Sequence, residues 1–196
     1  MSATVLYMSM SLDGFIAGPN DVRGNGLGDG GHCLHEWLWA DSKASSPSGV
    51  SAQVFDEIMA TGAVVVGRRT FELACGWAGD HHDGVPIFVL SYNRPPAEAS
   101  DWPNVTYVDD VESAMSKARN VAGGRDVLVH GALTAQLALA AGVLDEIQIH
   151  LIPVLLGDGR RLFDPIRPGH TKLELTRVID APAATHLRYR VRRQPV

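Results

Sequence analysis

Two segments of the sequence place a threonine hydroxyl three residues after a glycine, directly behind an apolar run. Gly67–Thr70 follows the run 63–66, and Gly131–Thr134 follows the run 126–130. Glycine allows a sharp backbone turn, and the free N–H groups at the start of a following helix attract anions. The two arginines of the first segment add positive charge where a phosphate group would lie. Each segment alone is equally typical of an ordinary helix start with solvated side chains.

A third segment, Leu90–Arg94, begins at the end of a strand-like run, residues 86–91, and by itself is an ordinary turn. Parallel strands of one sheet end at the same edge, and open α/β sheets bind their ligands there. If the three runs are strands of one sheet, their loops converge. Two helix starts and a loop with arginine and serine suit a ligand that carries several phosphates, such as a dinucleotide.

Three other patterns carry less weight. The glycines at positions 26, 28 and 31 match Gly-x-Gly-x-x-Gly, but the match neither leaves a strand nor opens a clear helix, so we interpret it as part of a flexible lid. Two histidine clusters, residues 32–35 and 81–83, lack the spacing of a zinc site, so we expect surface histidines and no metal. The sequence contains neither Gly-x-Ser-x-Gly nor a Walker loop, which leaves serine-triad and P-loop chemistry without support.

The candidate proton donor is Asp13, which follows an apolar run and precedes Gly14 at the rim of the predicted site. A carboxyl group there can act in catalysis, or its side chain can cap the turn, and the sequence leaves both roles open. Asp56 and Glu57 lie beside the apolar positions of a predicted helix over 51–59, and we expect both to face water.

Composition narrows the class of protein. The chain has 196 residues, with 17 Lys and Arg against 22 Asp and Glu, a formal charge of −5. This balance argues against a nucleic-acid or anionic-membrane partner, which would require a basic face. The arginines of 188–193 are interpreted as a solvated strand edge. With two cysteines, no apolar run of membrane-spanning length and no charged leader, we expect a soluble cytoplasmic protein.

The hydrophobic pattern alternates between short apolar runs and helical periodicity, and it ends in two segments of period two, 172–179 and 186–193. It predicts one α/β domain over 1–196, with a three-layer fold: a mixed central sheet, parallel in its core with an antiparallel C-terminal hairpin, flanked by helices. The segment 18–50 is long, glycine-rich and irregular, and we interpret it as a lid over the site.

Five motifs occur along the chain in a characteristic order. They are SLDGFIAG at Ser11–Gly18, VVGRRTFE at Val65–Glu72, FVLS at Phe88–Ser91, VHGA at Val129–Ala132, and the segment Asp145–Phe163. This order resembles the dihydrofolate-reductase-like superfamily and, within it, the RibD C-terminal family, the reductase domain of the bifunctional riboflavin-pathway enzyme. The resemblance covers nearly the whole chain and implies a sheet of about eight strands.

The resemblance also implies NADPH as the cofactor. Arg68 would contact its 2′-phosphate, while Ile16 and Ala17 would line the nicotinamide. The full set of implied cofactor contacts is Ile16, Ala17, Gly67, Arg68, Arg69, Thr70, Leu90, Ser91, Arg94, Gly131, Ala132, Leu133 and Thr134. The implied substrate contacts are Ser9, Trp37 and Phe55.

Two positions depart from the patterns of related enzymes. Riboflavin-pathway reductases resemble one another in a Ser-Leu-Asp-Gly-Lys pattern, and this chain has Phe15 at the position of its lysine. Folate enzymes have a carboxylate at the position near Ser51, where this chain has no acid. We therefore expect an NADPH-dependent reductase of a small planar heterocycle or of a carbonyl or imine compound, related to reduction of 5-amino-6-(5-phosphoribosylamino)uracil. The alternative is a protein that binds NADP(H) or a small ligand without turnover. The resemblance favours a homodimer.

Overall fold

The computed structural model describes residues 2–38, 49–93, 95–96, 101–164 and 170–192. Its elements, in chain order, are β1 (Thr4–Ser11), β2 (Phe15–Ala17), η1 (Gly31–Leu38), α1 (Gly49–Met59), β3 (Ala63–Gly67), α2 (Arg68–Leu73), η2 (Cys75–Gly79), β4 (Ile87–Leu90), β5 (Val105–Val108), α3 (Val111–Val121), β6 (Val127–His130), α4 (Ala132–Ala140), β7 (Glu146–Ile152), β8 (Arg160–Arg161), β9 (Leu173–Ala181) and β10 (Ala184–Val191). Among these described residues, no helix has the length and apolarity that crossing a membrane demands.

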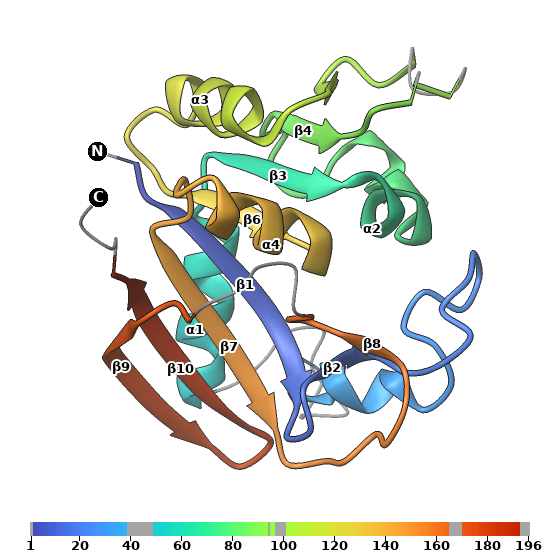
Figure 1. The fold of residues 1–196 in the computed structure, drawn as a ribbon, viewed down its shortest axis with the longest axis vertical. Coiled ribbons are helices and arrows are strands. Elements are labelled where there is room, and N and C mark those ends of the chain that lie inside the picture. The colour runs from blue at the N-terminus through green and yellow to red at the C-terminus, as the bar shows by residue number, and fades with distance from the viewer. Residues whose placement is uncertain (1, 39–48, 94, 97–100, 165–169, 193–196) are drawn as a thin grey trace. The chain divides into compact units, whose positions relative to one another are not determined.

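The strand order confirms the predicted fold class. Eight strands follow one another in the order β5-β4-β3-β6-β1-β7-β10-β9, and β2 pairs with β8 in a separate two-stranded sheet (Figure 1). The pairs from β5 to β1 are parallel, whereas β7, β10 and β9 pair antiparallel, as the period-two segments predict.

The chain divides into two compact units. The first comprises Met1–Leu6 and Ala60–Asp145, and the second comprises Tyr7–Met59 and Glu146–Val196. The first therefore holds the three predicted phosphate-binding loops. The second holds Asp13 and the predicted substrate contacts.

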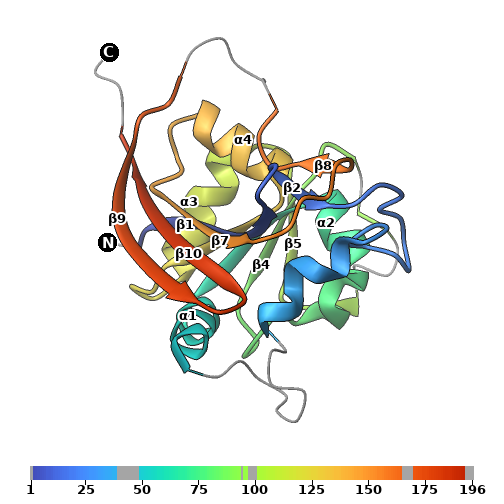
Figure 2. The same ribbon diagram turned by 90° about the horizontal axis from the view of Figure 1, so that it is seen from below.

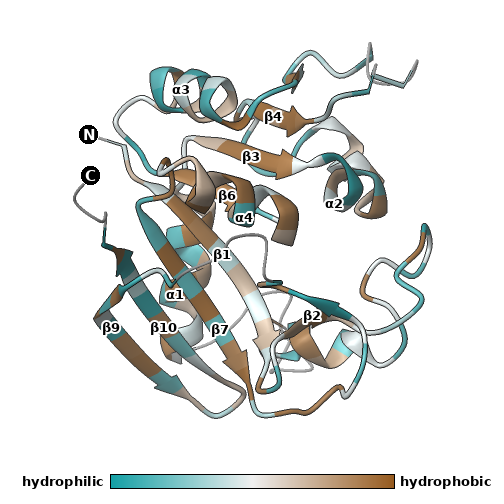
Figure 3. Cartoon of the chain, in the orientation of Figure 1, coloured by the Kyte–Doolittle hydropathy of each residue, from teal (hydrophilic) through white to brown (hydrophobic). Residues whose placement is uncertain are grey.

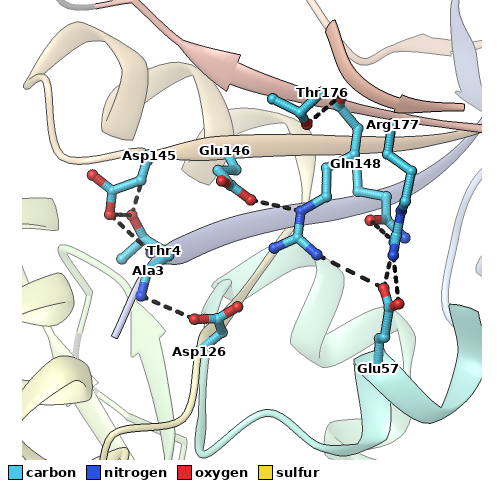
Figure 4. A network of polar contacts seen from close by, with 10 residues as sticks. Ala3, Thr4, Glu57, Asp126, Asp145, Glu146, Gln148, Thr176 and Arg177 are labelled. Atoms are coloured by element: carbon cyan, nitrogen blue, oxygen red, sulfur yellow. Dashed lines mark hydrogen bonds and ion pairs between the residues drawn. The ribbon is translucent and has the colours of Figure 1, made fainter. Parts of the chain in front are cut away.

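The first unit is built on apolar parallel strands. Residues 63–66 of β3 and 127–129 of β6 are fully buried, which is why these runs are continuously apolar rather than alternating (Figure 3). Helices α3 and α4 pack against β3 and β6. The beginning of β1 is fixed by polar contacts: the Asp145 carboxylate accepts from the backbone N–H of Thr4 at 3.0 Å and from Arg119 at 2.6 Å (Figure 4 shows Thr4 and Asp145).

The second unit packs α1 beside the hairpin of β9 and β10 (Figure 2). Glu57 of α1 receives hydrogen bonds from both terminal nitrogens of Arg177, one of them at 2.6 Å, and Arg188 donates to Glu146 at 2.6 Å (Figure 4). The predictions that Glu57 faces water and that Arg188 lies on a solvated edge are therefore wrong. Charged side chains long enough to reach across from helix to sheet meet there as pairs, a contact that helical periodicity does not reveal.

Candidate functional site

Two glycine loops interlock at the carboxyl ends of β3 and β6. A Cβ atom on Gly67 would lie 2.8 Å from the Thr134 hydroxyl, and a Cβ atom on Gly131 would lie 2.5 Å from the Thr70 hydroxyl. Gly131 also has a φ of 92°, a conformation that side-chain-bearing residues rarely adopt. Each loop therefore needs its glycine to admit the threonine of the other loop, and the structure brings both predicted segments together.

The start of α4 presents donors at this edge. Helix α4 begins at Ala132, and no side chain caps it at Gly131. The Thr134 hydroxyl oxygen is buried and has no hydrogen-bond partner within the described part of the chain. A buried hydroxyl without a partner costs free energy, and the uncapped backbone N–H groups at Ala132 and Leu133 attract anions. The loop thus has the donor set that a phosphate-bearing ligand requires.

The two arginines of the first loop differ in their surroundings. Arg69 is exposed, whereas the Nε atom of Arg68 donates to Glu72 at 2.6 Å across one turn of α2. Helix α2 has only six residues, so its own N-terminus contributes little. A phosphate at Arg68 would share this guanidinium with Glu72, a competition that the sequence did not reveal.

The third loop lies beside the first, because Leu90 of β4 is paired with Gly67 of β3. The Ser91 hydroxyl donates to the Asn93 carbonyl oxygen at 3.1 Å and accepts from the Asn93 N–H at 3.2 Å, which closes the turn locally. Tyr92 projects outward with 78% of its surface exposed. The predicted contact Arg94 falls outside the described residues.

The carboxylate of Asp13, in the second unit, accepts three hydrogen bonds. It accepts from the Ser11 hydroxyl at 2.5 Å and from the backbone N–H groups of Leu156 and Gly157 at 3.2 and 2.7 Å. The Ser11 hydrogen bond, aided by these backbone donors and opposed by partial burial, lowers the pKa of Asp13 to about 2. An acid with this pKa has no proton to donate at neutral pH. Of the two roles left open, the contacts favour capping the turn.

The predicted substrate contacts Ser9 and Trp37 lie together in the second unit. The indole N–H of Trp37 donates to the Ser9 hydroxyl at 2.9 Å, and both residues are buried. The Trp37 ring also packs against His150 and His186, at centroid distances of 4.6 and 5.0 Å. Phe55 is partly buried on α1. The remainder of the predicted lid, residues 39–48, lies outside the described residues.

A pocket of about 560 Å³ opens in the second unit beside β2, whose Ile16 and Ala17 are buried. Two arginines that the sequence analysis did not single out line it. Arg161 lies over the Phe15 ring, 4.3 Å from its centroid, and Arg160 pairs with Asp21 at 2.6 Å. The other lining residues are Gly18, Pro19, Gly157, Asp158, Gly159 and Asp164.

The glycine-rich segment has a packing role. A Cβ on Gly28 would lie 2.2 Å from the Gly18 carbonyl oxygen, and one on Gly18 would lie 1.9 Å from the Asp29 carbonyl oxygen. These glycines permit backbone to pack on backbone, so at Gly28 close approach rather than flexibility explains the residue.

The histidines at 81 and 82 are not surface residues as predicted. His82 is buried, and its Nε2 atom lies 3.1 Å from the Thr61 carbonyl oxygen. His81 contacts His82 through the two Nδ1 atoms at 2.7 Å. Within the described residues, no group of three or more His, Cys, Asp or Glu side chains is arranged to hold a metal ion.

Comparison with known proteins establishes the family. The family model of the RibD C-terminal domain matches residues 3–187, so the chain belongs to this family. No curated protein matches the sequence.

Solved structures share the fold. A crystal structure described as a riboflavin biosynthesis protein, from Shewanella sp. PV-4, has a TM-score of 0.74 at 22% identity, covering 97% of this chain and 99% of that one. A pyrimidine reductase-like protein from Corynebacterium diphtheriae has a TM-score of 0.64 at 15% identity, covering 98% and 93%. RibD from Acinetobacter baumannii has a TM-score of 0.63 at 18% identity, and the match covers 98% of this chain but 59% of that one.

Proposed function

We propose that the protein is an NADPH-dependent reductase that reduces a small planar heterocycle or a carbonyl or imine compound. Membership of the RibD C-terminal family supports a reductase of the riboflavin-pathway type. The observation that carries the cofactor assignment is the interlocked pair of glycine loops, in which Gly67 and Gly131 bring two threonine hydroxyls to the edge of one parallel sheet.

The residues present are suited to a dinucleotide with an additional phosphate. The uncapped start of α4 and the partnerless hydroxyl of Thr134 offer donors to a pyrophosphate. Arg68 and Arg69 supply the positive charge that distinguishes NADPH from NADH. Leu90 and the closed turn at Ser91 lie beside the first loop, and we assign them the contact with the adenine.

When bound, NADPH supplies the hydride, and the protein supplies binding, orientation and exclusion of water. Asp13 contributes by fixing the turn after β1 to residues 156–157. The same turn leads into β2, whose Phe15 lines the pocket of the second unit. The proton that accompanies the hydride comes from a group other than the Asp13 carboxyl, since that group is ionised at neutral pH.

In the pocket of the second unit, Arg161 is the group that can meet a substrate phosphate, since Arg160 is paired with Asp21. Phe15 replaces the lysine of related riboflavin-pathway motifs, but the Arg161 guanidinium lies over its ring and donates to the Asp13 carbonyl oxygen at 2.9 Å. A positive charge is therefore present beside residue 15. This arrangement is compatible with a phosphorylated pyrimidine of the riboflavin pathway.

A homodimer forms part of the proposal. Strand β9 is an edge strand, and Leu173, Leu175 and Val178 on it are 43%, 53% and 52% exposed. An exposed apolar edge of this kind favours pairing with a second copy. Sedimentation equilibrium would report the mass of the dimer, and Leu175→Lys would shift it to the monomer.

Calorimetry with NADPH and NADH tests the cofactor, and loss of NADPH absorbance with flavin precursors, pteridines and enones tests turnover. Tighter binding of NADPH, with turnover of at least one compound, is the expected result. Absence of heat with either cofactor would overturn the proposal. NADPH binding without turnover of any compound would favour a non-catalytic binding protein.

A further inference from the structure

A left-handed turn follows α2. Cys75, Gly76, Trp77 and Ala78 have φ values of 51°, 63°, 47° and 53°. Residues with side chains adopt this conformation singly and at a cost in free energy, so a run of them persists only where the surroundings impose it. The Trp102 ring packs so closely on Gly76 that a Cβ there would lie 2.6 Å away, which explains the glycine in this turn.

The left-handed turn places the Trp77 ring near the C-terminal end of β6. The Trp77 ring lies 6.2 Å from the His130 ring at an interplanar angle of 27°, and 4.6 Å from the His81 ring. His130 directly precedes Gly131, the glycine of the second cofactor loop. Trp77, His81 and His130, which we call the imidazole–indole wall, therefore border the edge where the dinucleotide is proposed to bind.

The hydrogen bonds fix the tautomers of the two neighbouring histidines. A carbonyl oxygen only accepts, so His82 Nε2, 3.1 Å from the Thr61 carbonyl, carries a hydrogen. With its hydrogen on Nε2, His82 offers Nδ1 as the acceptor, and the 2.7 Å contact then requires His81 to donate from its own Nδ1. The Nε2 atom of His81 is consequently unprotonated, and it has no hydrogen-bond partner among the described residues.

The environment keeps His81 neutral. Burial, followed by the neighbouring His130 and His82, lowers the pKa of His81 to about 3. The Nε2 lone pair is thus available as an acceptor throughout the neutral range, and the His81 ring stands edge-on to the rings of Trp77 and His130, at 72° and 79°. Such a surface complements a planar ring that carries an N–H donor at its edge.

We propose that the imidazole–indole wall is the substrate-recognition surface of the first unit, and that His81 selects a planar heterocycle by accepting a hydrogen bond from its N–H group. This inference deepens the proposed reductase function and rests on it. It assigns specificity to Trp77, which no motif indicates, to His81, which the sequence analysis treated as a surface histidine, and to His130 of the VHGA motif. It also limits the substrate class to heterocycles with an unsubstituted ring nitrogen.

The tautomers can be observed directly. Long-range ¹H–¹⁵N spectra of the full chain at pH 7 are expected to show His81 protonated at Nδ1 and His82 protonated at Nε2. His81 protonated at Nε2 would overturn the proposal, whatever the activity of the protein.

Ligand selection is tested by calorimetry in the presence of NADP⁺. The probes are 5,6-diaminouracil and its 1,3-dimethyl derivative, which has the same ring without ring N–H groups. We expect the dimethyl derivative to bind at least about tenfold more weakly, because the His81 acceptor is left without its donor. Equal affinities, or no binding of the first probe, would overturn the proposal even if NADP⁺ binds.

Variants test whether His81 causes the difference in affinity between the two probes. His81→Phe should abolish the discrimination between the probes, His81→Gln should retain part of it through the amide oxygen, and His32→Gln, at an exposed histidine, should change nothing. If His81→Phe does not fold, the comparison of the two probes on the wild-type protein still decides. Failure of the wild-type protein to bind NADP⁺ would instead count against the proposed function.

Discussion

The two units of the chain differ in the groups that form their candidate sites: backbone groups in the first and side chains in the second. In the first, buried parallel strands end in loops whose chemistry resides in backbone N–H groups and glycines, such as Gly67 and Gly131. In the second, polar side chains from helices pair with polar side chains from strands, as Glu57 of α1 does with Arg177 of β9 and Trp37 of η1 with Ser9 of β1. Figure 3 shows the contrast between the apolar β3 and the mixed colours of β9 and β10.

The difference teaches which kind of site a sequence reveals. A backbone site leaves a local signal, a glycine after an apolar run, because no other residue allows the turn and the close approach. A side-chain site depends on residues far apart in sequence, and each partner looks ordinary alone. The substitutions below test this contrast.

The largest effect is expected for Gly131→Ala. The new Cβ would lie 2.5 Å from the Thr70 hydroxyl at a φ of 92°, so the loop must open. We expect a loss of about 3–5 kcal/mol in the free energy of unfolding and at least about tenfold weaker NADPH binding. Gly124→Ala is the matched control, with a φ of 86° and no atom within 4 Å of its Cβ. Equal losses in urea unfolding would show that the backbone conformation, and not the interlock, matters.

Arg68→Ala should weaken NADPH by about 1.5–3 kcal/mol and NADH much less, because a charge-assisted contact to the 2′-phosphate is lost. Glu72→Gln sharpens this test. Removing the carboxylate 2.6 Å from Arg68 removes one competitor for the guanidinium and should tighten NADPH binding. Calorimetry with both cofactors measures both changes, and an equal loss for NADPH and NADH in the alanine variant would refute the assignment.

Acid should weaken the first unit through His81. Its folded pKa of about 3 lies below the usual value of 6.5, so the unfolded chain binds the proton more readily, and stability falls as the pH drops from 6.5 toward 3. This group alone should cost about 2 kcal/mol at pH 5. His81→Asn should flatten the pH dependence of unfolding over that window. An unchanged slope would contradict the burial that the structure shows.

The smallest effect is expected for the ion pair of the second unit. Glu57→Gln removes the charged partner of Arg177, which also donates to Gln148, while keeping the shape. Because both side chains are about one-third exposed, we expect a loss of only about 1 kcal/mol. Asp56→Asn, at the exposed neighbouring position, is the control and should be neutral. Chemical denaturation measures both, and a loss at Asp56 equal to that at Glu57 would remove the distinction between them.

Much of the fold could be predicted from the sequence. The apolar runs, the glycine loops and the period-two hairpin lie where expected, because burial on both faces and alternation across one face leave different patterns. The left-handed turn at Trp77 and the anchoring of His82 by Thr61 could not be predicted. Both depend on neighbours brought in by the fold, Trp102 and Thr61, which lies two residues before β3. For Asp13, the sequence predicted the location at the turn after β1 but not the role. The role follows from the three hydrogen-bond donors that its carboxylate meets in the fold.

The close packing of Gly18, Gly28 and Gly159 has a practical consequence for engineering. Any side chain there would strike a carbonyl oxygen at 1.9–2.2 Å, so these positions offer no room for variation. Of these glycines, Gly18 and Gly159 line the pocket of the second unit, together with Pro19, Asp158 and Arg160. A library meant to broaden the range of compounds accepted should randomise these rim positions and leave the glycines untouched.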